Sequence, residues 1–77
     1  MLIRSQSKTS LVNMDRVNVI YIAGGNTIQA FYSENDSDTL GIYSTEEKAM
    51  KVLDMIQNVY KHESRMFIMP ADQEVEV

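Results

Sequence analysis

The segment "DSDTLGIYSTEEKAMKVLDMIQNVYKHE", residues 36–63, decides the fold because its first half fits two different structures. Read as the calcium loop of an EF-hand, it supplies Asp36, Asp38 and Glu47 as metal ligands. Read as a strand that runs into a helix, it supplies Ser44 as the N-cap and Glu47 as the partner in a capping box. The first reading predicts a metal-binding site, whereas the second predicts only secondary structure.

The residues around this segment favour the strand and the helix. Leu40 stands at the fifth loop position, where an EF-hand normally supplies a side-chain oxygen. An EF-hand also needs a helix before its loop, but residues 27–33 alternate as a strand does. We therefore expect a helix over Thr45–Glu63 with Ser44 as its N-cap, and no metal or cofactor.

The predicted helix is amphipathic, with apolar residues at helical spacing on one side. The pair Glu47 and Lys51 lies outside this stripe and can form a favourable ion pair one turn apart. Such a stripe is typical of a helix that packs on a sheet. Its members are Ala49, Val52, Leu53, Ile56, Val59 and Tyr60.

Strands are predicted on both sides of the helix. Residues 17–23 are apolar on both faces, which is typical of a central strand, and the turn "GGN" at residues 24–26 joins them to a strand at 27–33. A polar loop at residues 34–38 leads to the strand that begins at Thr39.

Shorter strands are predicted at the two ends of the chain. Residues 2–6 and 10–13 fit a loose hairpin, and residues 65–69 fit a final strand that Pro70 stops. The fold class is therefore α+β: one antiparallel sheet of about five to six short strands, with the helix packed on one face. Residues 1–70 form a single domain, and we expect residues 71–77 to be a mobile acidic tail.

The size of the chain favours self-association. At 77 residues the core is small, and cores of this size rarely contribute more than about 3–5 kcal/mol. The chain has no cysteine, so disulfides do not add stability. No apolar run is long enough to span a membrane, and no signal peptide is recognisable. We expect a cytoplasmic homodimer or higher oligomer.

Methionines mark the predicted contact surface, because this side chain adapts well to partner surfaces. Met50 and Met55 flank the apolar stripe of the helix, and Met66, Phe67 and Met69 lie in the final strand. Peripheral core packing is the alternative role for these residues. The leading hypothesis is a non-enzymatic interaction or assembly module with an unknown protein partner, in which residues 65–69 or the tail add a strand to a neighbour.

A second hypothesis is a nucleic-acid-linked regulator. Residues 1–22 carry Arg4, Lys8 and Arg16 against a single carboxylate, and these three could contact phosphates. Residues 23–77 carry four basic residues against ten carboxylates, which disfavours nucleic acid and permits an acidic mimic of it. His62 is the single histidine, and it lies near the C-terminal end of the predicted helix, where a cation interacts favourably with the helix dipole. No catalytic motif is present, so the sequence does not predict an enzyme.

Two segments carry a resemblance to a known group of proteins. The opening "MLIRSQSKTSLVNMDRV" and the passage "LGIYSTEEKAMKVLDMI" resemble small uncharacterised proteins of Gram-positive bacteria and their phages or prophages. The resemblance covers about two thirds of the chain and consists of turns, a cap and an amphipathic helix. It implies a cytoplasmic, phage-associated protein, and it carries over no catalytic residue or ligand.

Overall fold

The structure is a computed structural model that describes residues 1–76, and the predicted α+β class is confirmed. Its described part holds six strands, one α-helix and two short 3-10 turns. In chain order they are β1 (Leu2–Arg4), β2 (Leu11–Asn13), η1 (Met14–Arg16), β3 (Val19–Ala23), β4 (Thr27–Ser33), β5 (Asp36–Ile42), α1 (Glu46–Lys61), β6 (Met66–Ile68) and η2 (Asp72–Glu74).

The six strands form two three-stranded sheets, so the predicted number of strands is confirmed, whereas their arrangement in a single sheet is not. Sheet A has the order β2-β1-β6, and sheet B has the order β3-β4-β5. Sheet A is mixed, because β6 pairs with β1 in parallel whereas β2 pairs with it antiparallel. The chain between β1 and β6 passes through sheet B and α1, and a parallel pair requires such a long connection. A pattern of strands along the chain does not reveal this split.

In sheet B, β4 is the central strand and β3 is an edge strand, which corrects the prediction that residues 17–23 form a central strand. Ile20 and Ile22 are half-buried and pack against the core, but Val19 and Tyr21 are exposed. The predicted turn after β3 is confirmed. Gly24 and Gly25 have φ angles of 62° and 85°, which glycine adopts without the steric cost that a side chain brings.

The polar loop predicted at residues 34–38 is shorter in the structure, since β5 already begins at Asp36. The hydroxyl of Tyr32 donates to Asp38 Oδ2 at 2.8 Å, and this bond between β4 and β5 helps to keep the polar residues in the strand. Because residues 27–33 and 36–42 are both strands, the opening segment is not the loop of a helix–loop–helix.

The predicted helix is confirmed, but its N-cap is Thr45 and not Ser44. Thr45 Oγ1 accepts a hydrogen bond from the Lys48 N–H at 3.1 Å, which satisfies one of the free donors of the first turn. The Ser44 N–H instead donates to Asp72 Oδ1 at 2.7 Å. Ser44 is therefore held by a distant part of the chain that a local capping pattern does not include.

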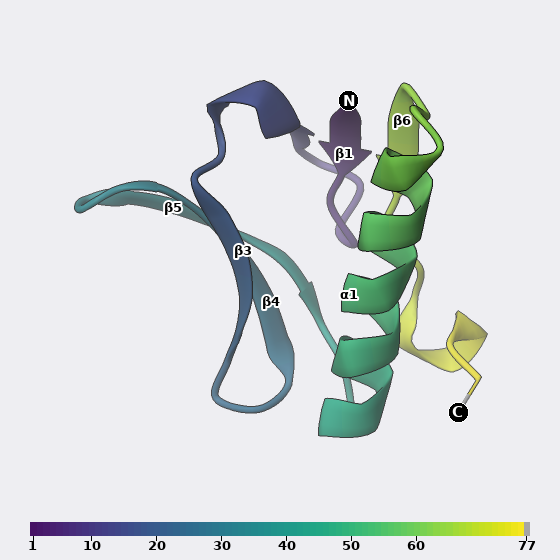
Figure 1. Ribbon diagram of the computed structural model, residues 1–77. Coiled ribbons are helices and arrows are strands. Elements are labelled where there is room, and N and C mark those ends of the chain that lie inside the picture. Colours follow the sequence, from purple (N-terminus) through teal and green to yellow (C-terminus); the bar gives the residue numbers. More distant parts are fainter. Residues whose placement is uncertain (77) are drawn as a thin grey trace.

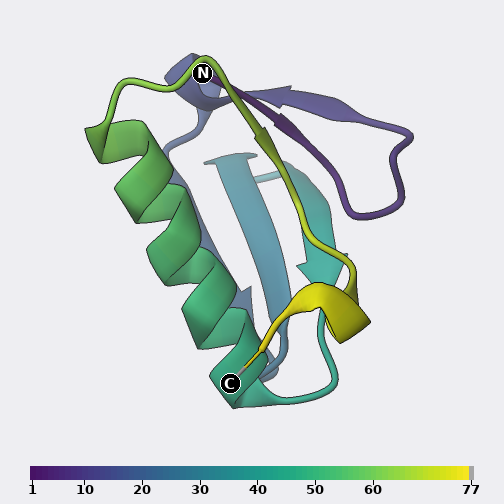
Figure 2. The same ribbon diagram turned by 90° about the vertical axis from the view of Figure 1, so that its right-hand side faces the viewer.

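The core lies where α1 and the two sheets meet. Figures 1 and 2 show α1 running alongside sheet B, with β1 and β6 toward the end of the molecule where the helix ends. On the helix, Ala49, Val52 and Ile56 are buried, whereas Tyr60 is exposed. No helix among residues 1–76 is long and apolar enough to cross a membrane. The buried apolar residues are Ile3, Val12, Ile28, Ala30, Leu40, Tyr43, Ala49, Val52, Ile56, Phe67, Met69 and Val75.

Gln6 joins the two sheets at the outer edge of β5. Its backbone N–H donates to the Leu40 carbonyl at 2.7 Å, and its side-chain Oε1 accepts from the Ile42 N–H at 2.9 Å. These bonds occupy part of the backbone edge of β5. The opposite edge of sheet B, at β3, has no such cover from the described residues.

The segment after β6, which the sequence suggests is a mobile tail, packs on the domain as far as it is described. Val75 is buried, and Lys48 Nζ donates to the Asp72 carbonyl at 3.0 Å. The hydroxyl of Tyr43 donates to the Pro70 carbonyl at 2.8 Å. The domain therefore extends beyond residue 70 and includes η2.

Candidate interaction surfaces

The outer face of sheet A is apolar and exposed. Because side chains alternate along a strand, Ile3, Val12 and Phe67 point into the core. The residues between them point outward, and four of these are large apolar side chains between 37% and 55% exposed. We call this set the sheet A outer face: Leu2, Leu11, Met66 and Ile68.

Arg4 lies in the middle of the sheet A outer face, with Leu11 beside it on one strand and Ile68 on the other. Its guanidinium donates from Nη1 to the Lys8 carbonyl at 3.0 Å, so it is held toward the β1–β2 turn. Lys8 adopts a positive φ of 71° in that turn. Two of the three predicted phosphate contacts therefore lie close together.

Arg16, the third predicted phosphate contact, lies elsewhere. It lines a polar hollow with Tyr32, Asp36 and Asp38, whose carboxylates oppose binding of a phosphate. Burial, followed by the hydrogen bond to Asp38, raises the pKa of Tyr32 to about 12. The three basic residues do not form one patch.

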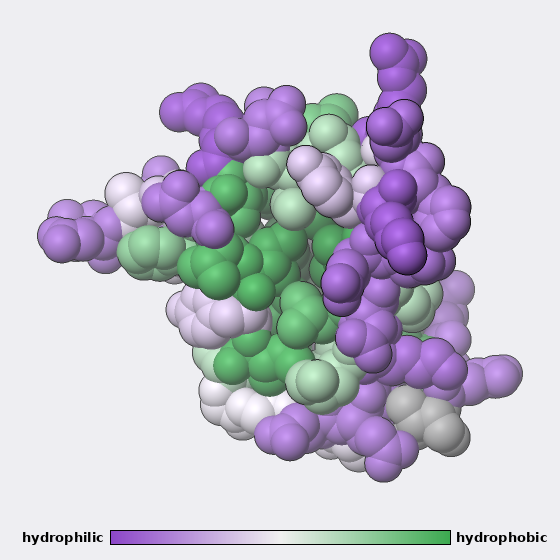
Figure 3. All heavy atoms as spheres, in the orientation of Figure 1, coloured by the Kyte–Doolittle hydropathy of each residue, from purple (hydrophilic) through white to green (hydrophobic). Residues whose placement is uncertain are grey.

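A second apolar surface runs between α1 and the edge strand β3. Met14 and Ile20 line it from the strand side, and Leu53, Ile56 and Tyr60 line it from the helix, around a volume of about 290 Å³. We call it the α1–β3 groove. Figure 3 shows hydrophobic surface between the β3–β4 hairpin and α1, in the orientation where β3 faces the viewer.

The predicted methionine surface is divided by the structure. Met50 and Met55 are exposed on the outer side of α1, where they line an open hollow with Asp54 and other polar residues. Met66 is exposed on sheet A, but Phe67 and Met69 are buried in the core. Phe67 and Met69 therefore act in packing, which was the alternative role, and they are not exposed to a partner.

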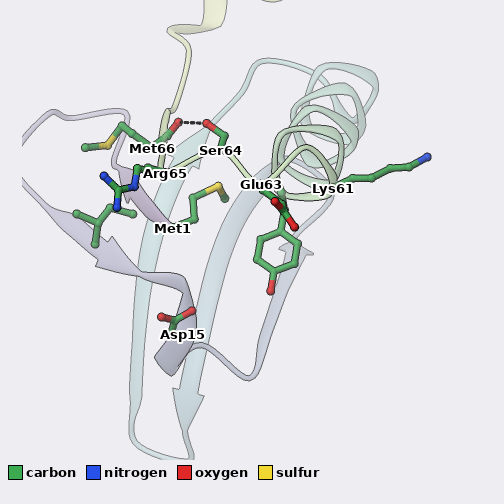
Figure 4. Close-up of a pocket in the computed structure, with 9 residues that line it drawn as sticks. Met1, Asp15, Lys61, Glu63, Ser64, Arg65 and Met66 are labelled. Atoms are coloured by element: carbon green, nitrogen blue, oxygen red, sulfur yellow. Dashed lines mark hydrogen bonds between the residues drawn. The ribbon is translucent and has the colours of Figure 1, made fainter.

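Another hollow lies at the end of α1 and has a volume of about 840 Å³. Figure 4 shows that Met1 and Asp15 approach it from the N-terminal segment, whereas Lys61 extends away from it. Its charged side chains are two acids, Asp15 and Glu63, and two bases, Lys61 and Arg65, so these side chains do not favour an ion of one sign. The hollow is open and shallow rather than an enclosed pocket.

His62 and the acidic residues of the EF-hand reading lie on separate elements of the fold. His62 directly follows the last residue of α1, whereas the predicted helix continued to Glu63, and His62 Nδ1 lies 2.7 Å from the Asn58 carbonyl. Asp36 and Asp38 lie on β5, and Glu47 lies in the first turn of α1. In the described part of the chain, no three His, Cys, Asp or Glu side chains gather in a way that could hold a metal ion.

Sequence reasoning missed most residues of the two apolar surfaces. Leu11, Ile68 and Tyr60 are apolar but give no signal in the sequence that separates them from core residues. Their exposure depends on which strands pair and on where α1 lies. Side chains alternate between the two faces of β1, β2 and β6, but strands of three residues are too short for the sequence to show which face is buried.

Comparisons of the chain with protein-family models, with curated proteins and with solved structures find no match. The resemblance to small bacterial and phage proteins therefore stays an expectation from the sequence.

Proposed function

We propose that the protein is a non-enzymatic interaction module that works by self-association. The observation that carries this proposal is the clustering of exposed apolar side chains on the sheet A outer face and along the α1–β3 groove. Single exposed apolar residues are normal on protein surfaces, but contiguous groups of them are typical of contact sites. A domain of this size also benefits from burying them, because its own core is small.

The resemblance to small proteins of Gram-positive bacteria and their phages supports a cytoplasmic site of action. Association in this setting assembles copies of the chain, or presents a composite surface to a further protein.

Light scattering after size-exclusion chromatography tests the proposal, with loading from about 10 to about 500 µM because association follows mass action. We expect a mass above the 8.8 kDa of one chain, rising with concentration. A constant mass of one chain over this range contradicts self-association.

The alternative function, a regulator that binds nucleic acid, has one supporting observation. Arg4 and Lys8 lie together at the β1–β2 turn, next to the exposed face of sheet A. Binding to duplex DNA or RNA at low salt, weakening steeply as salt rises, supports this alternative. Equal nucleic-acid binding by the wild type and by the double variant Arg4→Gln, Lys8→Gln contradicts this alternative.

A further inference from the structure

The edge strand β3 lacks the features that usually protect a free sheet edge. Its sequence is Val-Ile-Tyr-Ile-Ala over Val19–Ala23, with no charged residue and no proline. Natural edge strands are commonly blocked by lysine, by proline, by a bulge or by a covering element. The other edge of sheet B is partly covered by Gln6, but β3 is not covered in this way by the described residues.

The α1–β3 groove lies directly beside this edge, so a strand added to β3 also covers apolar surface. Ile20 belongs to both the strand and the groove, and Leu53 and Tyr60 face it from the helix. Tyr60 is 58% exposed, which is unusual for a large aromatic side chain at this position of an apolar stripe. Figure 3 shows this hydrophobic surface on the same side of the molecule as β3.

We propose that β3 pairs antiparallel with β3 of a second copy, so that the two B sheets join into one sheet of six strands. This inference rests on the proposed self-association and specifies its surface. Antiparallel pairing of identical strands requires a two-fold axis perpendicular to the sheet. Such an axis keeps both helices on the same face of the joined sheet. The two α1–β3 grooves then face each other and close over the joint.

The charges near β3 permit this arrangement. With the axis at Tyr21, Val19 of one copy stands opposite Ala23 of the other, so no like charges meet within the paired strands. The start of one β3 lies beside the β3–β4 turn of the second copy. Glu46 lies close to Gly25 in that turn, whereas Arg16, which precedes β3, lies in the hollow with Asp36 and Asp38 of its own copy. The pairing therefore rests on the uncharged backbone edge and the apolar groove.

The area involved matches a small but specific dimer. Val19, Tyr21 and Tyr60 are each between 38% and 58% exposed, and the half-buried groove residues add to them. Together with the backbone edge they give an interface at the low end of the range for specific complexes, below about 1,200 Å² in total, which is typical of weak association. The sheet A outer face stays free in this dimer for a further partner.

The test compares one substitution on β3 with a matched substitution on the other apolar surface. Tyr21→Lys places a charge on an exposed position at the centre of β3, opposite its own copy in the dimer. Ile68→Lys places the same charge on the exposed face of sheet A. Light scattering gives the mass of each variant, and circular dichroism checks that it is folded. Val19→Lys replaces Tyr21→Lys if the latter does not fold.

We expect the wild type and Ile68→Lys to have twice the 8.8 kDa mass of one chain, and folded Tyr21→Lys to have the mass of one chain. A dimer that survives Tyr21→Lys, or one that Ile68→Lys abolishes, overturns the β3 pairing while self-association stands. A wild type that stays monomeric at about 500 µM overturns both the β3 pairing and the proposed self-association.

Discussion

Tyr43 makes the stability of the protein sensitive to alkaline pH. Its ring is buried, and its hydroxyl donates to the Pro70 carbonyl at 2.8 Å. Burial, followed by the nearby carboxylates of Asp72 and Glu74, raises the pKa of Tyr43 from 10.0 to about 12. The folded state therefore keeps the phenolic proton at pH values where the unfolded chain loses it.

The direction and the size of the effect follow from this pKa. A raised pKa contributes stability that is fully present below the unfolded value and is lost as the pH rises through the folded value. The two-unit rise to about 12 corresponds to roughly 2.7 kcal/mol in full, of which about 1.4 kcal/mol is already lost near pH 11. Because the total stability of a domain this small is about 3–5 kcal/mol, the loss is large.

Tyr43→Phe isolates this effect from other groups that titrate at high pH. The variant keeps the ring but loses the hydrogen bond, which costs about 1 kcal/mol at neutral pH. Urea unfolding followed by circular dichroism, at values between about pH 7 and about pH 11, gives the free energy of unfolding of both proteins. We expect the wild type to be more stable at neutral pH and the difference to vanish near pH 11. A difference that stays constant with pH refutes the reasoning.

Two further substitutions test the packing around Tyr43 and the C-terminal segment. A Cβ on Gly41 would lie 3.0 Å from the Tyr43 ring, so Gly41→Ala should lower the free energy of unfolding by about 1–3 kcal/mol in urea titrations; an unchanged value would show that the ring moves freely. The hydrogen bond from the Ser44 N–H, and then the Lys48 charge, lower the pKa of Asp72. The ionised carboxylate therefore contributes stability to the folded state above the unfolded carboxyl pKa, and this contribution is lost as the pH falls. Asp72→Asn should therefore lower the melting temperature at neutral pH, and the difference from the wild type should shrink in acid. An equal difference at both pH values would show that the charge of Asp72 does not stabilise the fold.

Local features of the fold could be predicted from the sequence, whereas long-range pairing could not. The turn at Gly24 and Gly25 and the extent of α1 follow from residues that are neighbours in the chain. The N-cap was placed one residue too early because Ser44 and Thr45 are neighbours that can both cap a helix, and in the structure Thr45 Oγ1 accepts from the first turn. The division into two sheets depends on the parallel pairing of β1 with β6, and no local pattern encodes that pairing.

The interaction surfaces show the same limit. Val19 and Tyr21 were assigned to a covered strand because apolar residues on both faces usually mean burial on both faces. In the structure β3 is an edge, so the same residues become an exposed, uncharged strand. The proposed dimer pairs the backbone edge of β3, while Val19 and Tyr21 stay on the outer face of the joined sheet. Met50 and Met55 were correctly placed outside the apolar stripe, since helical spacing alone decides that position.

Disulfide trapping at the two-fold axis tests β3 pairing most directly, because the natural chain has no cysteine to compete. Directly opposite residues in an antiparallel pair have Cα atoms about 4.5–5.5 Å apart, which suits a disulfide. With Tyr21→Cys we predict rapid, nearly complete formation of a covalent dimer under mild oxidation, and only slow formation with Met50→Cys on the outer side of α1. A Tyr21→Cys protein that stays monomeric, or crosslinks no faster than Met50→Cys, contradicts the account.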